Sequence, residues 1–147
     1  MTLITDLEEE LTEAMKARDA DRRDALRLIL ASLRGAEKEL QRPLHDDEEL
    51  QVLQRERKKR HEAAEAFRDA GREAQAENEE AELAVLEEFM PEPLSEEELE
   101  RIVDDAIAET GATNMRDMGR VMADVTPQIA GRADGSAVSQ LVREKLA

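Results

Sequence analysis

The segment Gly131-Arg132-Ala133-Asp134-Gly135 has the residue types and spacing best suited to binding chemistry, namely the docking of a partner. Gly131 permits a left-handed turn, and Asp134 can accept backbone N–H groups at the start of a helix. Gly135 lacks a side chain and lets another molecule approach the backbone closely. Arg132 is expected to project outward, where a guanidinium can make forked hydrogen bonds. The same residues are equally well explained as a capped turn between two helices.

Catalysis is poorly supported by the residue types. His45 and His61 are the only histidines, and each lies in a charged context typical of a solvated side chain. The sequence has no cysteine, no Walker-type phosphate loop and no serine nucleophile elbow. The acidic run Glu96 to Glu98 suits the positive end of a helix dipole better than a metal site. We therefore expect no catalytic residue, no metal and no cofactor.

A structural ion pair is predicted between the third and fourth helices. Arg60 falls on the apolar stripe of its helix, together with Val52 and Leu53. A charge in that position needs a partner, because an unpaired buried ion costs several kcal/mol. Glu79 falls on the corresponding stripe of the next helix, so we predict an Arg60–Glu79 pair with Glu82 as a substitute. The alternative is that Arg60 faces a partner molecule.

The distribution of charge distinguishes the end of the chain from the rest. The net charge of −16 disfavours broad adhesion to nucleic acid or to an anionic membrane. It divides into −10 over residues 1–90, −7 over residues 91–112 and +1 over residues 113–147. An anionic partner could therefore approach only the last segment without strong repulsion. The candidate cationic contacts in that segment are Arg116, Arg120, Arg132, Arg143 and Lys145.

Apolar residues at three- and four-residue spacing predict an all-α fold, and the aromatic content of 1% also favours helices over strands. Four helices are expected in the first part of the chain. The second of them ends at Pro43, because proline cannot continue a helix. The third begins at a capping box formed by Asp46 and Glu49.

Pro91 and Pro93 cannot both lie inside a helix, so they mark a domain boundary. We predict an N-terminal helical domain over residues 1–90 and a linker over residues 91–94. A smaller three-helix domain is expected over residues 95–147.

Three helices are expected in this C-terminal domain. The first begins at a capping box that starts with Ser95 and stops at Gly111. Asn114 caps the second, Pro127 ends it, and Asp134 caps the third. Three methionines of the middle helix either fill the core or form an adaptable apolar surface: Met115, Met118 and Met122.

Motifs in both domains together resemble a known family. In the C-terminal domain they are Met118-Gly119, Val121-Met122, Gly131 to Gly135, Val138, Leu141 and Val142. In the N-terminal domain they are Leu26-Arg27, Lys59-Arg60, Phe67, Ala70-Gly71-Arg72, Glu79, Glu82-Leu83 and Pro91. Together they span nearly the whole chain, which is similar to the stand-alone YqeY-like branch of the GatB/YqeY family.

The resemblance implies an all-α fold with a larger N-terminal and a smaller C-terminal helical part. It also implies a place beside tRNA amidation, because the B subunit of the tRNA-dependent amidotransferase ends in a related helical tail that touches tRNA. The associated activity, carbon–nitrogen ligase activity with glutamine as amido-N-donor, belongs to that subunit, whose catalytic cradle lies in a different domain. The candidate partner-binding residues are Gly119, Arg120, Gly131, Arg132, Asp134, Gly135 and Arg143.

The sequence leaves three alternative functions. The first is a non-catalytic, tRNA-associated accessory module. The second is a protein–protein adaptor that docks on a translation-related or other enzyme through the C-terminal helices. The third is an amidase or ligase in its own right. Residues 1–10 lack the order of a signal peptide, and no apolar run approaches about 18 residues, so we expect a cytoplasmic protein without membrane contact.

Overall fold

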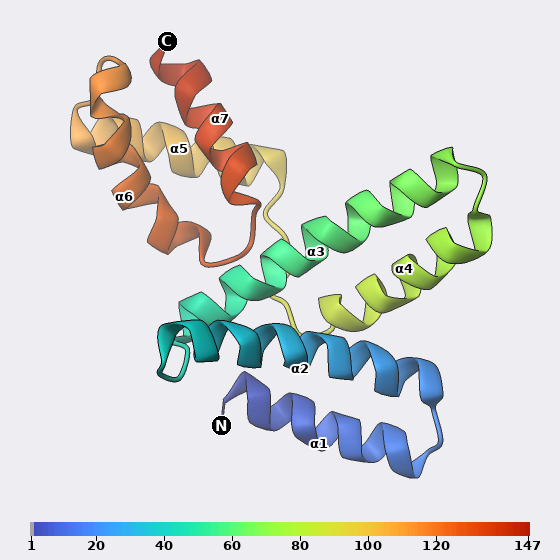
Figure 1. Cartoon of the computed structure of the whole chain (residues 1–147). Coiled ribbons are helices and arrows are strands. Elements are labelled where there is room, and N and C mark those ends of the chain that lie inside the picture. Colours follow the sequence, from blue (N-terminus) through green and yellow to red (C-terminus); the bar gives the residue numbers. More distant parts are fainter. Residues whose placement is uncertain (1) are drawn as a thin grey trace. The chain divides into compact units, whose positions relative to one another are not determined.

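The computed structural model describes residues 2–147, and over these residues the chain is all-α, as predicted, with no strand (Figure 1). Seven α-helices and one short 3-10 helix are present in this range. The chain divides into two compact units between Met90 and Pro91. The first unit holds four α-helices and the second holds three, which agrees with the count from the sequence. No helix of the described range is long and apolar enough to cross a membrane.

The first unit is built from two helical hairpins. Its helices are α1 (Leu3–Lys16), α2 (Ala20–Leu40), α3 (Asp46–Asp69) and α4 (Glu73–Glu87). Helix α1 packs against α2 and α3 packs against α4, while α2 also contacts both α3 and α4 (Figure 1). The core contains aliphatic side chains, namely Leu7, Ala14, Leu26, Ile29, Leu30, Leu33, Val52, Leu53 and Leu86.

Helix α2 ends earlier than the proline suggests. Its last residue is Leu40, and Gln41 takes a left-handed conformation with φ of +58°. Pro43 disfavours the helical region for Arg42 before it, so the helix cannot reach the proline itself.

The start of α3 is displaced by one residue from its predicted position. His45 is the N-cap in place of Asp46, and its N–H donates to Glu48 Oε1 at 2.9 Å. Arg42 also donates to both oxygens of this carboxylate, at 2.8 and 2.9 Å. Arg42 and the His45 N–H lower the pKa of Glu48 to about 2. Glu49, predicted to close the capping box, instead lies inward at 6% exposure, and burial raises its pKa.

Ion pairs connect α3 and α4 along their length. Arg57 Nε lies 3.3 Å from Glu87 Oε1, near the end of the hairpin that contains the leucine core. Arg68 Nη2 lies 3.0 Å from Glu73 Oε1, near the turn at Gly71. Only Val52, Leu53, Ala64, Ala76 and Leu86 are buried apolar residues on the described parts of these two helices. The contact between α3 and α4 therefore depends on charge as well as on apolar burial.

The second unit packs three α-helices around a small aliphatic core. Its elements are α5 (Glu96–Thr110), the 3-10 helix η1 (Met115–Asp117), α6 (Met118–Ile129) and α7 (Gly135–Leu146). Ser95 and Glu98 form the predicted capping box, and Gly111 ends α5 with φ of +68°. The buried core residues are Val103, Ala106, Val121, Val125, Ile129, Val138, Val142 and Leu146.

Pro127 does not end α6, contrary to the prediction. It lies in the last turn, and the helix continues to Ile129 before Ala130 turns left-handed with φ of +47°. A proline so close to the end removes one backbone donor and leaves most of the helix intact. Thr126 Oγ1 also donates to the Met122 carbonyl at 2.7 Å in this turn.

The three methionines of this region divide between the core and the surface. Met118 and Met122 pack against the core of the second unit, whereas Met115 is 45% exposed. Asn114 caps η1 rather than α6, so Met115 lies on a separate turn before the longer helix begins. Core filling therefore accounts for two of the three methionines.

Candidate partner-binding surface

The turn between α6 and α7 has the local geometry that its residues predict. Gly131 has φ of +77°, a left-handed conformation that L side chains rarely adopt. Asp134 is the N-cap of α7, and its Oδ1 accepts the Ser136 N–H at 3.3 Å. Gly135 is exposed, and a Cβ built on it would meet no atom within 4 Å. The chain itself therefore gives no steric reason for glycine at position 135.

Arg132 does not project outward, contrary to the prediction. Its Nε donates to the Glu92 carbonyl at 2.8 Å, and its Nη2 lies 3.9 Å from Glu98 Oε2. Its own carbonyl accepts the Leu94 N–H at 2.9 Å. We call residues 92–94 the strap, because Arg132 fastens this segment to the α6–α7 turn. The contact joins residues 40 positions apart in sequence, which no local pattern reveals.

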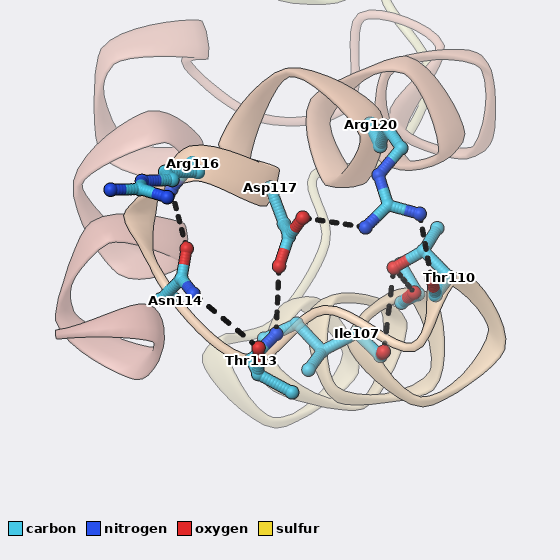
Figure 2. Close-up of polar contacts among 8 residues, drawn as sticks. Ile107, Thr110, Thr113, Asn114, Arg116, Asp117 and Arg120 are labelled. Atoms are coloured by element: carbon cyan, nitrogen blue, oxygen red, sulfur yellow. Dashed lines mark hydrogen bonds and ion pairs between the residues drawn. The ribbon is translucent and has the colours of Figure 1, made fainter.

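Arg120 is also used inside the second unit, at the connection between α5 and α6 (Figure 2). Its Nη1 donates to the Thr110 carbonyl at 3.1 Å, and its Nη2 donates to Asp117 Oδ1 at 2.5 Å. The other oxygen of Asp117 accepts the Thr113 N–H at 3.0 Å. The hydrogen bond from the Thr113 N–H has the largest effect in lowering the pKa of Asp117, and the hydrogen bond from Arg120 has the next largest. Arg120 thus clasps the end of α5 to the start of α6.

Gly119 and Arg116 lie beside this clasp and remain accessible. Gly119 is exposed, and a Cβ built on it would meet no atom within 4 Å. The backbone N–H of Arg116 donates to Asn114 Oδ1 at 2.9 Å. Figure 2 shows its guanidinium on the opposite side of Asp117 from Arg120.

The five candidate cations therefore differ in availability. Lys145 Nζ lies 2.9 Å from Asp104 Oδ1, a contact that raises the pKa of Lys145. Lys145, Arg120 and Arg132 are each matched by an acid of the same unit. Over residues 2–147, the exposed side chains of Arg116 and Arg143 have no ion pair. These two present the uncompensated positive charge of the predicted set.

The structure brings Arg60, Glu79 and Glu82 together in the first unit. Arg60 Nη1 lies 3.1 Å from Glu79 Oε2 and 3.5 Å from Glu82 Oε2. Sequence reasoning missed Glu56, whose Oε2 lies 3.7 Å from Arg60 Nη2 and whose Oε1 accepts the Ser32 hydroxyl at 2.8 Å. Its position four residues before Arg60, on the same stripe, is the signal that could have found it. Three carboxylates therefore share one guanidinium. Burial has the largest effect in raising the pKa of Glu82, and the nearby charge of Glu79 raises it further.

The two histidines of the chain belong to α3 and its N-cap. His45 and His61 are exposed, and His61 Nε2 lies 3.2 Å from Glu65 Oε1 on the same helix. Within the described range, no group of three or more His, Cys, Asp or Glu side chains is placed to hold a metal ion.

A family model described as "Yqey-like protein" matches residues 4–146 of this chain. The chain belongs to the YqeY-like family. This assignment confirms the resemblance drawn from the motifs, and the match covers both helical units.

Three relatives extend this assignment. The chain is 31% identical to the E subunit of glutamyl-tRNA(Gln) amidotransferase from Thermococcus gammatolerans, over 99% of this chain and 24% of that one. It is 32% identical to altered inheritance of mitochondria protein 41, mitochondrial, of Pyrenophora tritici-repentis, over 94% of this chain and 77% of that one. It is also 35% identical to an uncharacterized Schizosaccharomyces pombe protein, over 60% of this chain and 72% of that one. The YqeY-like chain thus spans about a quarter of the amidotransferase subunit that it matches.

Proposed function

We propose that this YqeY-like protein is a non-catalytic, tRNA-associated accessory module that docks through its C-terminal unit. The observation that carries the proposal is the match to the amidotransferase E subunit. This match covers 99% of this chain but only 24% of that protein. The similarity therefore corresponds to one module of a larger protein whose name includes a tRNA. We infer that this module retains an association with tRNA.

The surface of the second unit supports this proposal. Gly119 and Gly135 are exposed at the starts of α6 and α7, with open space where their side chains would be. A phosphate backbone could therefore approach the main chain closely at either position. Arg116 and Arg143 supply positive charge in the only segment of the chain that is not acidic. With so few cations, binding should depend on salt with a shallow slope, near −1 for each phosphate contact.

Fluorescence anisotropy of labelled total tRNA, titrated with the full chain at low salt, tests the proposal. Arg143→Glu should weaken binding by about tenfold or more, since a charge-assisted hydrogen bond contributes about 1.5–3 kcal/mol. Arg101→Glu is the matched control, because Arg101 is exposed on α5 and has no ion pair among the described residues. Absence of binding at tens of micromolar wild-type protein would contradict the proposal, because even non-specific binding is detected in that range. Arg132→Glu is a poor choice, because it would break the strap contact as well as remove a cation.

The second candidate function is a protein–protein adaptor. It is favoured by Met115, which is 45% exposed beside Arg116 and offers an adaptable apolar contact. Affinity capture with the full chain before and after nuclease treatment separates the two functions. An adaptor retains its protein partner after nuclease treatment. A tRNA-associated module loses the proteins that it captured through tRNA.

The proposal includes two further expectations from the sequence. The chain is taken to lack amidotransferase or ligase activity of its own, and ATP- and glutamine-dependent ammonia transfer by the purified chain would overturn this. The protein is also taken to be cytoplasmic, although one relative is named as mitochondrial. Cell fractionation tests the compartment.

A further inference from the structure

The strap is held by one residue through both its main chain and its side chain. Pro91 and Pro93 have no N–H, so Glu92 and Leu94 supply the only backbone donors of residues 91–94. The Leu94 N–H donates to the Arg132 carbonyl at 2.9 Å, and Leu94 also packs against the core of the second unit. The Glu92 carbonyl accepts from Arg132 Nε at 2.8 Å.

The Arg132 guanidinium directs two of its donor nitrogens at groups of its own chain. Nε and Nη2 can form the paired donors with which arginine binds a carboxylate or a phosphate. Here Nε meets the Glu92 carbonyl, and Nη2 lies 3.9 Å from Glu98 Oε2. The second distance is too long for a hydrogen bond, so Glu98 attracts the guanidinium by charge without satisfying its donors. A phosphate placed there could make both hydrogen bonds at full strength.

We propose that Glu98 and the Glu92 carbonyl restrain Arg132, and that an anionic partner recruits Arg132 by displacing them and so releases the strap. This inference rests on the proposed function, because the partner at the α6–α7 turn is taken to be tRNA phosphate. It makes Glu98 an autoinhibitory contact of the docking surface. Binding and restraint are then linked reciprocally, so weakening the restraint must tighten binding.

Glu98→Gln removes the restraining charge with little disturbance to the helix. Glu98 accepts the Ser95 N–H at 3.4 Å and donates its own N–H to Ser95 Oγ at 3.1 Å. Glutamine serves equally at this position of a capping box, so α5 keeps its N-terminus. Glu97→Gln is the matched control, because Glu97 is an exposed neighbour without an ion pair among the described residues. Both substitutions change the net charge by the same amount.

The experiment compares wild-type, Glu98→Gln and Glu97→Gln full-length chains by anisotropy with labelled total tRNA at low salt. We expect Glu98→Gln to bind at least about threefold more tightly than Glu97→Gln. This gain should disappear when Arg132→Gln is added to Glu98→Gln. Saturation of the wild-type chain with tRNA should also speed amide hydrogen exchange at Leu94.

The outcomes separate this inference from the proposed function. Equal affinities for Glu98→Gln and Glu97→Gln, with clear binding by all three chains, overturn the restraint and leave the proposed function standing. Unchanged Leu94 exchange at saturation overturns release of the strap. Absence of binding by all three chains overturns the proposed function and the restraint together.

Discussion

Arg60→Met tests whether the charged cluster between α3 and α4 stabilises the first unit. The substitution keeps an apolar stem and removes the guanidinium that three carboxylates share. At an effective dielectric constant of about 20, each contact at 3.1–3.7 Å contributes roughly 5 kcal/mol before desolvation and carboxylate repulsion are subtracted. These opposing terms cancel most of it, and removing one partner of a buried pair costs about 3–5 kcal/mol. The side chains are 15–22% exposed, so we expect the lower end, about 3 kcal/mol.

Thermal unfolding followed by far-UV circular dichroism measures the effect. For a domain of this size, a loss of about 3 kcal/mol lowers Tm by about 12 °C or more. The deficit should shrink as pH falls, because burial raises the pKa of Glu82 and its protonated form needs no cationic partner. Arg55→Met is the control, since Arg55 is exposed on the same helix. A Tm for Arg60→Met that equals or exceeds the wild-type value near neutral pH would refute the reasoning.

Three further predictions concern single positions. Glu82→Gln should raise the free energy of unfolding in urea near neutral pH. The raised pKa of Glu82 means that its stabilising contribution is present below about pH 4.5 and lost as pH rises. Glu48→Gln should have the opposite sign, because a pKa near 2 makes the contribution of Glu48 present above about pH 4.5 and lost as pH falls. In an acid titration, the free energies of unfolding of the Glu82→Gln and Glu48→Gln chains should therefore differ near neutral pH and converge near pH 2. Gly131→Ala should cost about 1–2 kcal/mol, because φ is +77° there, whereas Gly135→Ala should be neutral or stabilise slightly in the same urea assay.

The helices and most of their ends could be predicted because the responsible interactions are local. The capping box of Ser95 and Glu98 spans three residues, and the left-handed Gly111 follows directly after its helix. The start of α3 was displaced by one residue because two adjacent acids, Glu48 and Glu49, could each complete a box. Arg42, which precedes the helix, holds Glu48 in that role.

The availability of Arg132 and Lys145 could not be predicted, because their partners are distant in sequence. Arg132 is fixed by Glu92 and Glu98, and Lys145 is matched by Asp104 on another helix. A charge count over a segment adds these cations as if each faced solvent. Their pairing depends on how α5 packs against the later helices.

The ion pairs along α3 and α4 have a consequence for the register of this hairpin. Arg57, Arg60 and Arg68 meet glutamates that follow in the reverse order along α4, as an antiparallel alignment requires. A slip of α4 by one turn, about 5.4 Å, would separate every arginine from its glutamate at once. Val52, Leu53 and Leu86 also oppose a slip at one end of the hairpin, whereas nearer the turn only the small Ala64 and Ala76 are buried. Arg60 and Arg68 therefore hold the alignment over the part of the hairpin where the apolar contacts hold it least.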